Sequence, residues 1–128
     1  MEVKAFWRRK YQVDVRARQF SVLTDEPPDF SGEDAGMMPT ELFLASVASC
    51  FCMAIIYVAT KRRIEVDDME VDVEGEKDVK NFVFTKLIVK VRSTVPARTL
   101  EALIEEARKY CFVSRTITNR CPIEFRVI

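Results

Sequence analysis

The most reactive side chains in this 128-residue chain belong to four cysteines, Cys50, Cys52, Cys111 and Cys121. The sequence contains no histidine, so it lacks every Cys–His and Ser–His catalytic pair and the commonest zinc ligand. A cysteine attacks as its thiolate and can then form a sulfenic acid or a disulfide. Redox chemistry, metal binding and plain burial are therefore the uses open to these four residues.

Metal binding fits this pattern poorly. Cys50 and Cys52 lie two apart in a stretch expected to be helical, where their side chains would point about 200° apart. They can neither chelate one metal ion easily nor bridge each other. No second cysteine pair follows, so we expect no metal site and no cofactor. Burial of all four cysteines as small apolar residues remains open, because free cysteine is among the most buried residue types.

The elements around the cysteines are indicated by hydrophobic periodicity. Apolar and polar residues alternate from Val3 to Leu23, which predicts two or three strands. Residues Thr24 to Pro39 are rich in proline, glycine and acidic residues and predict a loop. The triplet Pro39-Thr40-Glu41 is typical of a helix start, with Glu41 favoured in the first turn by the helix dipole.

Residues Leu42 to Ala59 contain no charged side chain. Their eighteen residues reach the lower bound of about 17 to 25 for a membrane span. The flanking strand patterns need a soluble core, so we interpret the segment as a buried central helix and not as a membrane span. One domain of this size would struggle to cover such a helix, and we expect a partner subunit to cover it.

The C-terminal half predicts a hairpin, a helix and a final strand. The charged run Lys61 to Arg63 suits a helix C-terminus. A strand at Met69 to Val73 should then turn at Gly75 to Lys80 into a strand at Phe82 to Val91. In that second strand we expect one face to carry Val83, Thr85, Leu87, Val89 and Val91.

Pro96 marks the start of an amphipathic helix whose end carries Cys111. The alternation in Pro122 to Ile128 predicts a last strand. The fold class is therefore α+β, as a single domain over residues 1–128 with a mainly antiparallel sheet and a long buried central helix.

Charge and the N-terminal sequence exclude further classes. Lysine plus arginine equals aspartate plus glutamate, so no broad basic surface is expected and nucleic acid is not a partner. Residues Met1 to Lys10 lack the apolar stretch of a secretory signal, so we expect a cytoplasmic protein with reduced thiols.

Two segments resemble the OsmC/Ohr family of osmotically inducible and organic hydroperoxide resistance proteins. The segment Gly36 to Cys50 is similar to the family stretch in which a peroxidatic cysteine follows a proline by eleven positions, from Pro39 to Cys50. The segment Lys109 to Arg115 resembles the second signature, which places the resolving cysteine at Cys111. Matching both cysteines in register makes the resemblance more specific than either segment alone.

The resemblance implies an OsmC-like intertwined homodimer and a stress-response, antioxidant activity. A thiolate at Cys50 would reduce a small-molecule organic hydroperoxide, forming a sulfenic acid that condenses with Cys111 to a disulfide. A dithiol or protein reductant would reopen that disulfide. A family arginine from the N-terminal strands activates the thiol. Counting along the strands favours Arg9 for this role, with Arg8 and Arg16 as alternates, and each could equally be a solvated strand arginine.

The sequence departs from the family at three points. Thr40 stands where Ohr-type members carry the glutamate that holds the arginine, and Glu41 is expected to cap the helix instead. Phe112 stands where a proline is common. Cys52 and Cys121 match no family role, and we expect both in the core. These departures keep a non-catalytic OsmC-like dimeric module that binds a small ligand as the alternative function, and an interaction protein built on the apolar helix as a third.

Overall fold

The computed structural model describes residues 1–127, which form two compact units, residues 1–43 and 44–127. The division falls inside the long helix of the chain. The single domain expected over residues 1–128 stays a prediction. The predicted α+β class is confirmed, because antiparallel strands and helices both occur in the described residues.

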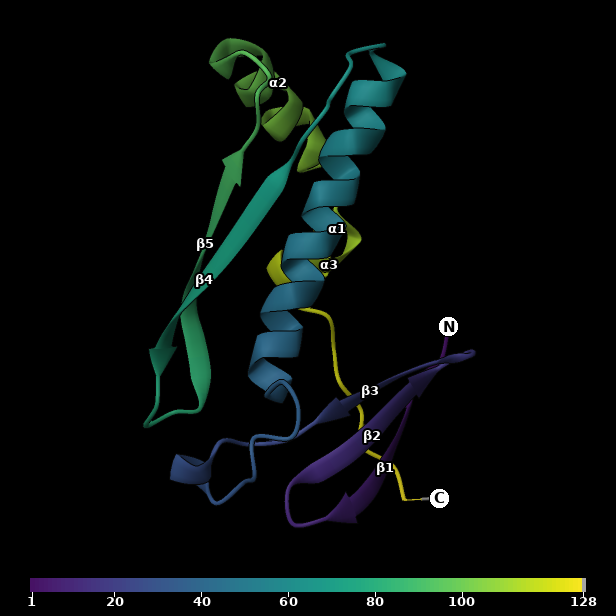
Figure 1. The fold of residues 1–128 in the computed structure, drawn as a ribbon, viewed down its shortest axis with the longest axis vertical. Helices are drawn as coiled ribbons and strands as arrows, with labels where there is room; N and C mark the ends of the chain where they lie inside the picture. Colours follow the sequence, from purple (N-terminus) through teal and green to yellow (C-terminus); the bar gives the residue numbers. More distant parts are fainter. Residues whose placement is uncertain (128) are drawn as a thin grey trace. The chain divides into compact units, whose positions relative to one another are not determined.

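The first unit contains a three-stranded antiparallel sheet in the order β1-β2-β3 (Figure 1). Its strands are β1 (Lys4–Arg9), β2 (Gln12–Ala17) and β3 (Phe20–Thr24). Tight turns join them, with left-handed backbone at Lys10 (φ 46°) and Arg18 (φ 55°). The strands expected between Val3 and Leu23 are thus confirmed as a meander of three.

The loop after β3 folds back on that strand. It contains one short 3-10 helix, η1 (Pro28–Phe30), and Thr24 forms an isolated bridge with Met37. The backbone N–H of Asp25 donates to the carbonyl of Met37 at 3.2 Å. The loop predicted between Thr24 and Pro39 is therefore present, and its two ends are joined by backbone hydrogen bonds.

The long helix α1 (Pro39–Lys61) begins and ends where the sequence predicts. The N–H of Met38 donates to Oε2 of Glu41 at 2.9 Å, so Glu41 caps the first turn as expected. At the other end Arg63 adopts left-handed backbone (φ 57°) and Ile64 N–H donates to the carbonyl of Ala59 at 2.9 Å. This Schellman-type arrangement satisfies the last carbonyls of the helix.

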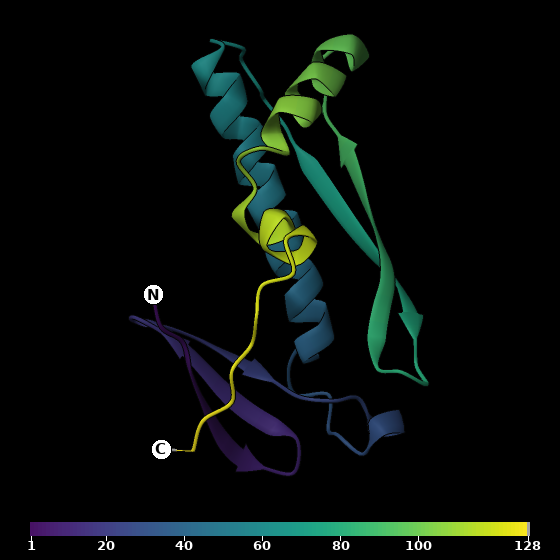
Figure 2. The ribbon, with the colours of Figure 1, turned by 180° about the vertical axis from the view of Figure 1, so that it is seen from behind.

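The second unit places a hairpin and two shorter helices around α1 (Figures 1 and 2). The hairpin pairs β4 (Glu70–Asp78) with β5 (Val83–Arg92) in antiparallel register. The helices are α2 (Ala97–Ala107), whose N-cap is Pro96, and α3 (Phe112–Thr118). Two strands without a third are marginally stable in water, so the hairpin depends on its packing against the helices.

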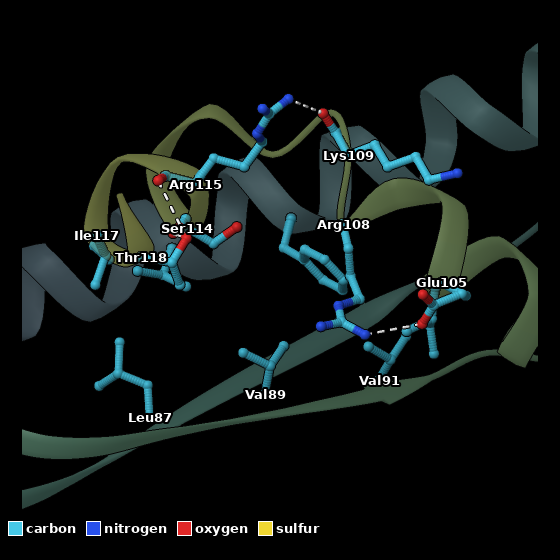
Figure 3. A pocket seen from close by; sticks show the side chains of 13 residues that line it. Leu87, Val89, Val91, Glu105, Arg108, Lys109, Ser114, Arg115, Ile117 and Thr118 are labelled. Atoms are coloured by element: carbon cyan, nitrogen blue, oxygen red, sulfur yellow. Dashed lines mark hydrogen bonds and ion pairs between the residues drawn. The ribbon is translucent and has the colours of Figure 1, made fainter. Parts of the chain in front are cut away.

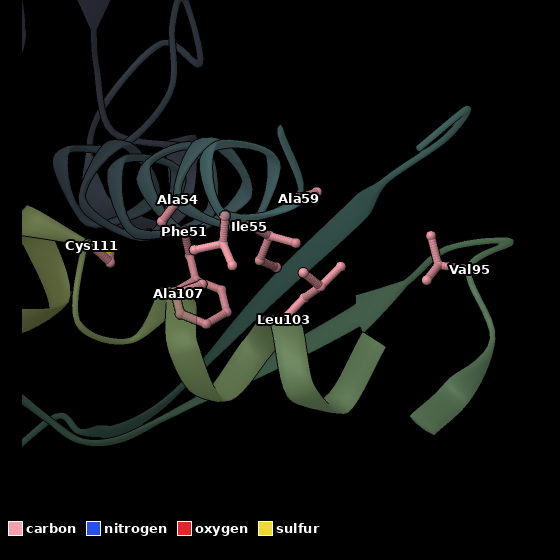
Figure 4. Close-up of a cluster of buried hydrophobic side chains, with 9 residues drawn as sticks. Phe51, Ala54, Ile55, Ala59, Val95, Leu103, Ala107 and Cys111 are labelled. Atoms are coloured by element: carbon pink, nitrogen blue, oxygen red, sulfur yellow. The ribbon is translucent and has the colours of Figure 1, made fainter. Parts of the chain in front are cut away.

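The core of this unit lies between α1 and α2 (Figure 4). Ile55 and Leu103 are both fully buried at its centre. The other buried members of the cluster are Phe51, Ala54, Val58, Ala59, Val95, Ala107 and Cys111. Their spacing along α1, at three and four residues, defines one inner face of the helix.

The expected burial of α1 on all sides is not complete in one chain. Its outer face exposes Met53 (65%), Tyr57 (52%) and Ile56 (38%). By length and composition α1 could also cross a membrane. Its inner face, however, forms the core of the second unit, as in the core helix of a folded domain.

Two details of the predicted hairpin are wrong. Gly75 lies inside β4 opposite Leu87 and not in the turn. A Cβ at Gly75 would lie 2.5 Å from the Phe84 ring, so this glycine lets the ring pack on the strand. Glu76 and Lys77 of β4 pair with Lys86 and Phe84, so Thr85 is an extra, unpaired residue of β5, and this bulge interrupts the alternation predicted from Val83 through Thr85 to Leu87.

The predictions for the C-terminal part are also corrected. The predicted helix ends at Ala107, and Cys111 lies beyond it as the N-cap of α3. No strand forms in residues 122–127, and Ile128 lies outside the described residues. An alternating sequence forms a strand only when a neighbouring strand pairs with its backbone N–H and C=O groups. No strand among the described residues pairs with residues 122–127.

Candidate functional site

Cys50 lies on α1 at the border of its inner face. Its side chain is half-buried, and it packs against the core cluster of the second unit. Ala54 follows one helical turn later on the same side. The thiol of Cys50 is therefore neither free in solvent nor sealed in the core, which suits a thiol that must meet a small substrate.

Cys111 is fully buried in the connection between α2 and α3. Its backbone is extended (φ −76°, ψ 100°), and its N–H donates to the carbonyl of Ala107 at 3.1 Å. Figure 4 shows Cys111 at the edge of the buried cluster that α1 and α2 form. Cys111 is the N-cap of α3, and its carbonyl accepts the N–H of Arg115 at 3.1 Å, so a local opening that moves its sulfur would release hydrogen bonds only at the ends of α2 and α3.

The structure brings Cys50 and Cys111 to the same cluster. Cys111 belongs to its buried residues, and Cys50 is among the partly buried residues that pack against it. The two side chains approach it from different elements, α1 and the α2–α3 connection. Both thiols are free.

The residue before Cys111 is fastened to α1. The hydroxyl of Tyr110 accepts a hydrogen bond from Nζ of Lys61 at 3.3 Å. This hydrogen bond raises the pKa of Lys61, so the ammonium form is favoured. Nearby, Arg62 pairs with Glu106 of α2. The last turn of α1 and the residue after it therefore contact the chain just before and just after the C-terminus of α2, at Glu106 and Tyr110.

Arg9, Arg8 and Arg16 lie on the sheet of the first unit, and their ion pairs differ. Nη2 of Arg9 contacts Oε2 of Glu33 at 2.8 Å. Arg8 and Arg16 instead share Asp14, at 3.5 Å and 2.6 Å. Hydrogen bonds from Arg16 are the main cause that lowers the pKa of the Asp14 carboxyl.

Arg16 is further committed to its own sheet. Its guanidinium lies over the Phe6 ring, with 4.9 Å from Cζ to the ring centroid. It also donates to Asp14 through Nε at 2.8 Å. Among the three candidates, Arg9 has a carboxylate partner from the loop that leads into the Cys50 helix.

The two cysteines without a family role differ from each other. Cys52 is half-buried on α1, as a residue at the margin of the core. Cys121 is exposed in the segment after α3, so its expected place in the core is wrong. It lies directly before residues 122–127, which form no strand.

A groove of about 1000 Å³ opens between α1 and β5 (Figure 3). Val47 and Phe51 line it from α1, and Leu87, Val89 and Val91 point into it from β5. Its other lining residues are Ile104, Glu105, Arg108, Lys109, Ser114, Arg115, Ile117 and Thr118. None of the described lining residues is a cysteine, so the groove is distinct from the two thiols.

Sequence reasoning missed two acidic residues of the first unit. Asp25 is almost fully buried (1% exposed) and accepts backbone N–H groups from Glu26, Glu33 and Ala35. Glu33 holds Arg9 and Lys10. A signal was present, because an aspartate directly after a strand often organises the following loop through its own backbone hydrogen bonds.

No cluster of three metal-ligating side chains occurs within residues 1–127. The second unit offers a half-buried thiol and a second, fully buried thiol at the same core. These are parts suited to thiol redox chemistry.

Comparisons with known proteins address the family. The model of OsmC-like protein matches residues 32–126. The chain is 27% identical over 114 residues to peroxiredoxin OsmC of Escherichia coli, covering 83% of this chain and 80% of that protein. It is 32% identical over 94 residues to an uncharacterized protein of Methanocaldococcus jannaschii, covering 70% of this chain. The chain spans only 48% of that relative's length.

A solved structure supports the fold. The crystal structure of an organic hydroperoxide resistance protein OsmC from Legionella pneumophila matches with a TM-score of 0.71 and 24% sequence identity. The match covers 91% of this chain and 87% of that one. The family model, which spans most of the chain, shows that the protein belongs to the OsmC-like family.

Proposed function

We propose that this protein is a thiol-dependent peroxidase that reduces organic hydroperoxides, with Cys50 as the attacking thiol and Cys111 as the resolving thiol. The observation that carries the proposal is that both thiols border one core cluster, Cys50 half-buried and Cys111 fully buried. The family supports the reaction class, because the relative from E. coli is named a peroxiredoxin and the Legionella protein an organic hydroperoxide resistance protein.

The first step is attack of the Cys50 thiolate on the distal oxygen of the hydroperoxide. The S–O bond forms as the O–O bond breaks, and the leaving alkoxide takes a proton to become an alcohol. The hydroperoxide is thereby reduced by two electrons, and Cys50 is oxidised to a sulfenic acid. The partial burial of Cys50 limits the reaction to small or apolar-tailed substrates.

The second step is attack of the Cys111 thiolate on the Cys50 sulfur. The S–O bond breaks, a disulfide forms, and the hydroxide takes a proton to leave as water. A disulfide requires a Cα separation of roughly 4.4 to 6.8 Å. The non-helical backbone of Cys111 supports a local opening that brings the sulfurs together. A dithiol or protein reductant then returns both thiols.

Arg9 is the residue proposed to favour the thiolate at Cys50, with Arg8 and Arg16 as alternates. A guanidinium close to a thiol favours the anionic form by charge attraction. Arg9 is supported over the alternates by its ion pair with Glu33 of the loop before α1, whereas Arg8 and Arg16 are both engaged with Asp14 of their own sheet.

The working form is proposed to be a homodimer of single-domain chains in the cytoplasm. The uncharged outer face of α1, with Met53, Ile56 and Tyr57, supports a partner subunit. So does the hairpin of β4 and β5, which has no third strand among the described residues.

The test is a peroxide consumption assay with cumene hydroperoxide and hydrogen peroxide under a dithiol reductant. Wild type should consume cumene hydroperoxide faster than hydrogen peroxide, and Cys50→Ser should lose the activity. The matched control is Cys52→Ser, which changes a cysteine two residues away and should keep the activity. If the wild type and Cys50→Ser consume hydroperoxide at the same rate, the proposal is wrong.

A second candidate is a non-catalytic OsmC-like dimeric module that binds a small ligand. The observation in its favour is the groove between α1 and β5, whose lining combines apolar and charged side chains and contains no cysteine among the described residues. The same assay separates the two, because a binding module gives no turnover in the wild type.

A further inference from the structure

The groove between α1 and β5 lies within the second unit, and its two ends differ in character. Figure 3 shows Leu87 at one end, and Glu105 and Arg108 at the other end. Leu87, Val89 and Val91 alternate along β5 and point into the groove, so their row extends over about 13 Å. The groove therefore has an apolar end and a charged end.

The apolar end combines a buried wall with accessible side chains. Val47 and Phe51 of α1 are 1% and 6% exposed, so the core holds them in place. Val89 of β5 and Ile117 of α3 also line the groove, and they remain 38% and 40% exposed. Accessible apolar side chains around a hollow of about 1000 Å³ favour the binding of an apolar chain, because binding removes both surfaces from water.

The charged end carries an excess of cations. Nη1 of Arg108 donates to Oε2 of Glu105 at 2.9 Å. A guanidinium has five N–H donors in a planar fork, so this contact leaves donors for a second acceptor. Lys109 and Arg115 also line the groove, and neither forms an ion pair with a carboxylate among the described residues. Three cations and one carboxylate therefore border the groove, which favours an anion.

The two hydroxyl groups of the lining are engaged in their own segment of the chain. The hydroxyl of Ser114 donates to the carbonyl of Cys111 at 3.3 Å, and that of Thr118 donates to the carbonyl of Ser114 at 3.1 Å. A sugar or a nucleotide needs several directed polar partners, and these donors are already used. The apolar row and the charge of Arg108 are thus the features that can select a ligand.

We propose that this groove binds a free carboxylic acid with a single alkyl chain, its tail along Leu87 and Val89 and its carboxylate at Arg108. Such an acid is ionised at neutral pH, so its charge complements the excess of cations. No cysteine is among the described lining residues, so the acid is bound there and not oxidised. The inference therefore does not depend on peroxidase activity.

The test is isothermal titration calorimetry with three probes. Decanoate has both the carboxylate and the tail, 1-decanol has only the tail, and acetate has only the carboxylate. The wild type should bind decanoate saturably below its micellar concentration, 1-decanol more weakly and acetate not measurably. Added sodium chloride should weaken the binding of decanoate and leave that of 1-decanol unchanged, because salt screens the charge contact.

Four variants locate the two ends of the ligand. Arg108→Gln should weaken decanoate binding by about fivefold and leave 1-decanol binding unchanged. Glu105→Gln should strengthen decanoate binding, because it removes the carboxylate that competes for Arg108. Ile117→Thr should weaken the binding of both probes, because it adds a hydroxyl to the apolar end. Arg98→Gln is the matched control, since it removes the same charge from an exposed position of α2 outside the lining.

Hydrogen exchange and a cysteine variant test the location of the ligand. Saturating decanoate should slow amide exchange in β5 and α3 and leave β1, β2 and β3 unchanged. Cys50→Ser should bind decanoate as tightly as the wild type. Weaker binding in Cys50→Ser would place the ligand at the thiol and overturn the proposal, whatever the peroxide assay reports.

Three further results would overturn the proposal. The first is an absence of saturable decanoate binding by the wild type. The second is a decanoate affinity that is unchanged in Arg108→Gln, or that falls equally in Arg108→Gln and Arg98→Gln. The third is dissociation of a dimer in Ile117→Thr, measured by light scattering, which would show that a second copy of the chain occupies the groove.

Discussion

The ring of Tyr110 packs edge-on against the ring of Tyr57, with centroids 5.0 Å apart and planes at 63°. Tyr57 belongs to the exposed side of α1, and Tyr110 directly precedes the buried Cys111. Lys61, one turn after Tyr57, donates to the Tyr110 hydroxyl. The aromatic pair and this hydrogen bond together fasten the connection that carries the proposed resolving thiol.

We expect Tyr110→Leu to loosen this connection. Loss of an edge-to-face pair should lower the free energy of unfolding by about 1 kcal/mol. The rate of Cys111 alkylation under native conditions should rise, because local opening exposes buried groups. Urea unfolding and alkylation followed on the Cys111 peptide measure the two effects.

Tyr110→Phe separates the ring from the hydroxyl, since it keeps the aromatic pair and the Lys61 ammonium over the ring and removes only the hydrogen bond from Lys61. Its unfolding free energy should stay close to that of the wild type, because an exposed hydrogen bond contributes little. Tyr11→Leu, a change of the same kind in the first unit, should leave Cys111 as protected as before. If Cys111 is alkylated at the same rate in all variants, Tyr110 does not protect this thiol.

We expect one equivalent of organic hydroperoxide to join Cys50 to Cys111 within one chain. Both thiols border the same cluster, whereas Cys121 lies exposed after α3 and Cys52 points to another side of α1. Peptide mapping without reductant identifies the bridge. In Cys111→Ser the sulfenic acid of Cys50 should persist and react with dimedone.

The outcome of the mapping decides the assignment of the sulfurs. A dominant bridge that contains Cys52 or Cys121 would mean that Cys111 is not the resolving thiol. Cys121→Ser is the control, because it removes the most exposed thiol and should leave the Cys50–Cys111 bridge unchanged.

Much of this fold could be predicted from local pattern. The alternation of apolar and polar residues predicted the three strands before Thr24. The charge-free stretch bounded by Pro39 and Lys61 predicted the long helix with its cap at Glu41. These features depend on neighbours in sequence, where period and capping rules apply. The position of Cys50 on α1 followed from the same pattern and from one family segment, whereas Cys111 was expected at the end of the amphipathic helix and lies beyond it, as the N-cap of α3.

The predictions are wrong where the structure depends on contacts between residues that are far apart in the sequence. The bulge opposite Glu76 shifts the pairing register of β5 by one residue, and the hydrophobic pattern of one strand does not reveal such a shift. The alternation after Pro122 lacks a neighbouring strand among the described residues, so it forms no ladder and leaves Cys121 exposed. Glu33 lies 24 positions from Arg9 in a loop without period, so only the folded loop pairs them.

The carboxyl of Asp25 makes the first unit sensitive to acid. Burial raises its pKa, but hydrogen bonds from the N–H groups of Ala35, Glu26 and Glu33 outweigh burial and hold the pKa below the ordinary value of 3.8. A depressed pKa stabilises the folded state above the unfolded value. We therefore expect this contribution to be complete at neutral pH and to be lost as the pH falls below about 3.8 toward the folded value.

The variant Asp25→Asn tests that window. It keeps the size of the side chain but sets an uncharged amide against three backbone donors, so it should unfold at lower temperature at pH 7. The difference from the wild type should shrink as the pH falls below 4, where the wild-type carboxyl also becomes protonated. Asp29→Asn, an exposed position of the same loop, should change little at either pH. A difference that is constant over this range would show that the charge of Asp25 is not responsible.

The last prediction concerns the outer face of α1. Met53, Ile56 and Tyr57 are exposed on a helix without charges from Leu42 to Ala59, and such an apolar surface is expected to be covered in solution. We expect light scattering to report twice the mass of one chain. Ile56→Glu should shift the protein toward monomer, because the interface would then bury an unpaired carboxylate.

Ala102→Glu is the matched control for that substitution. It adds the same charge to an exposed apolar position of a helix, α2, and should leave the mass unchanged. The Ile56→Glu variant also tests whether the active site requires the partner subunit. If a monomeric Ile56→Glu variant keeps its far-ultraviolet circular dichroism and loses hydroperoxide consumption, the partner subunit is needed for activity. A wild type that remains monomeric at micromolar concentration, or an Ile56→Glu variant that remains dimeric, would exclude this face of α1 as the dimer contact.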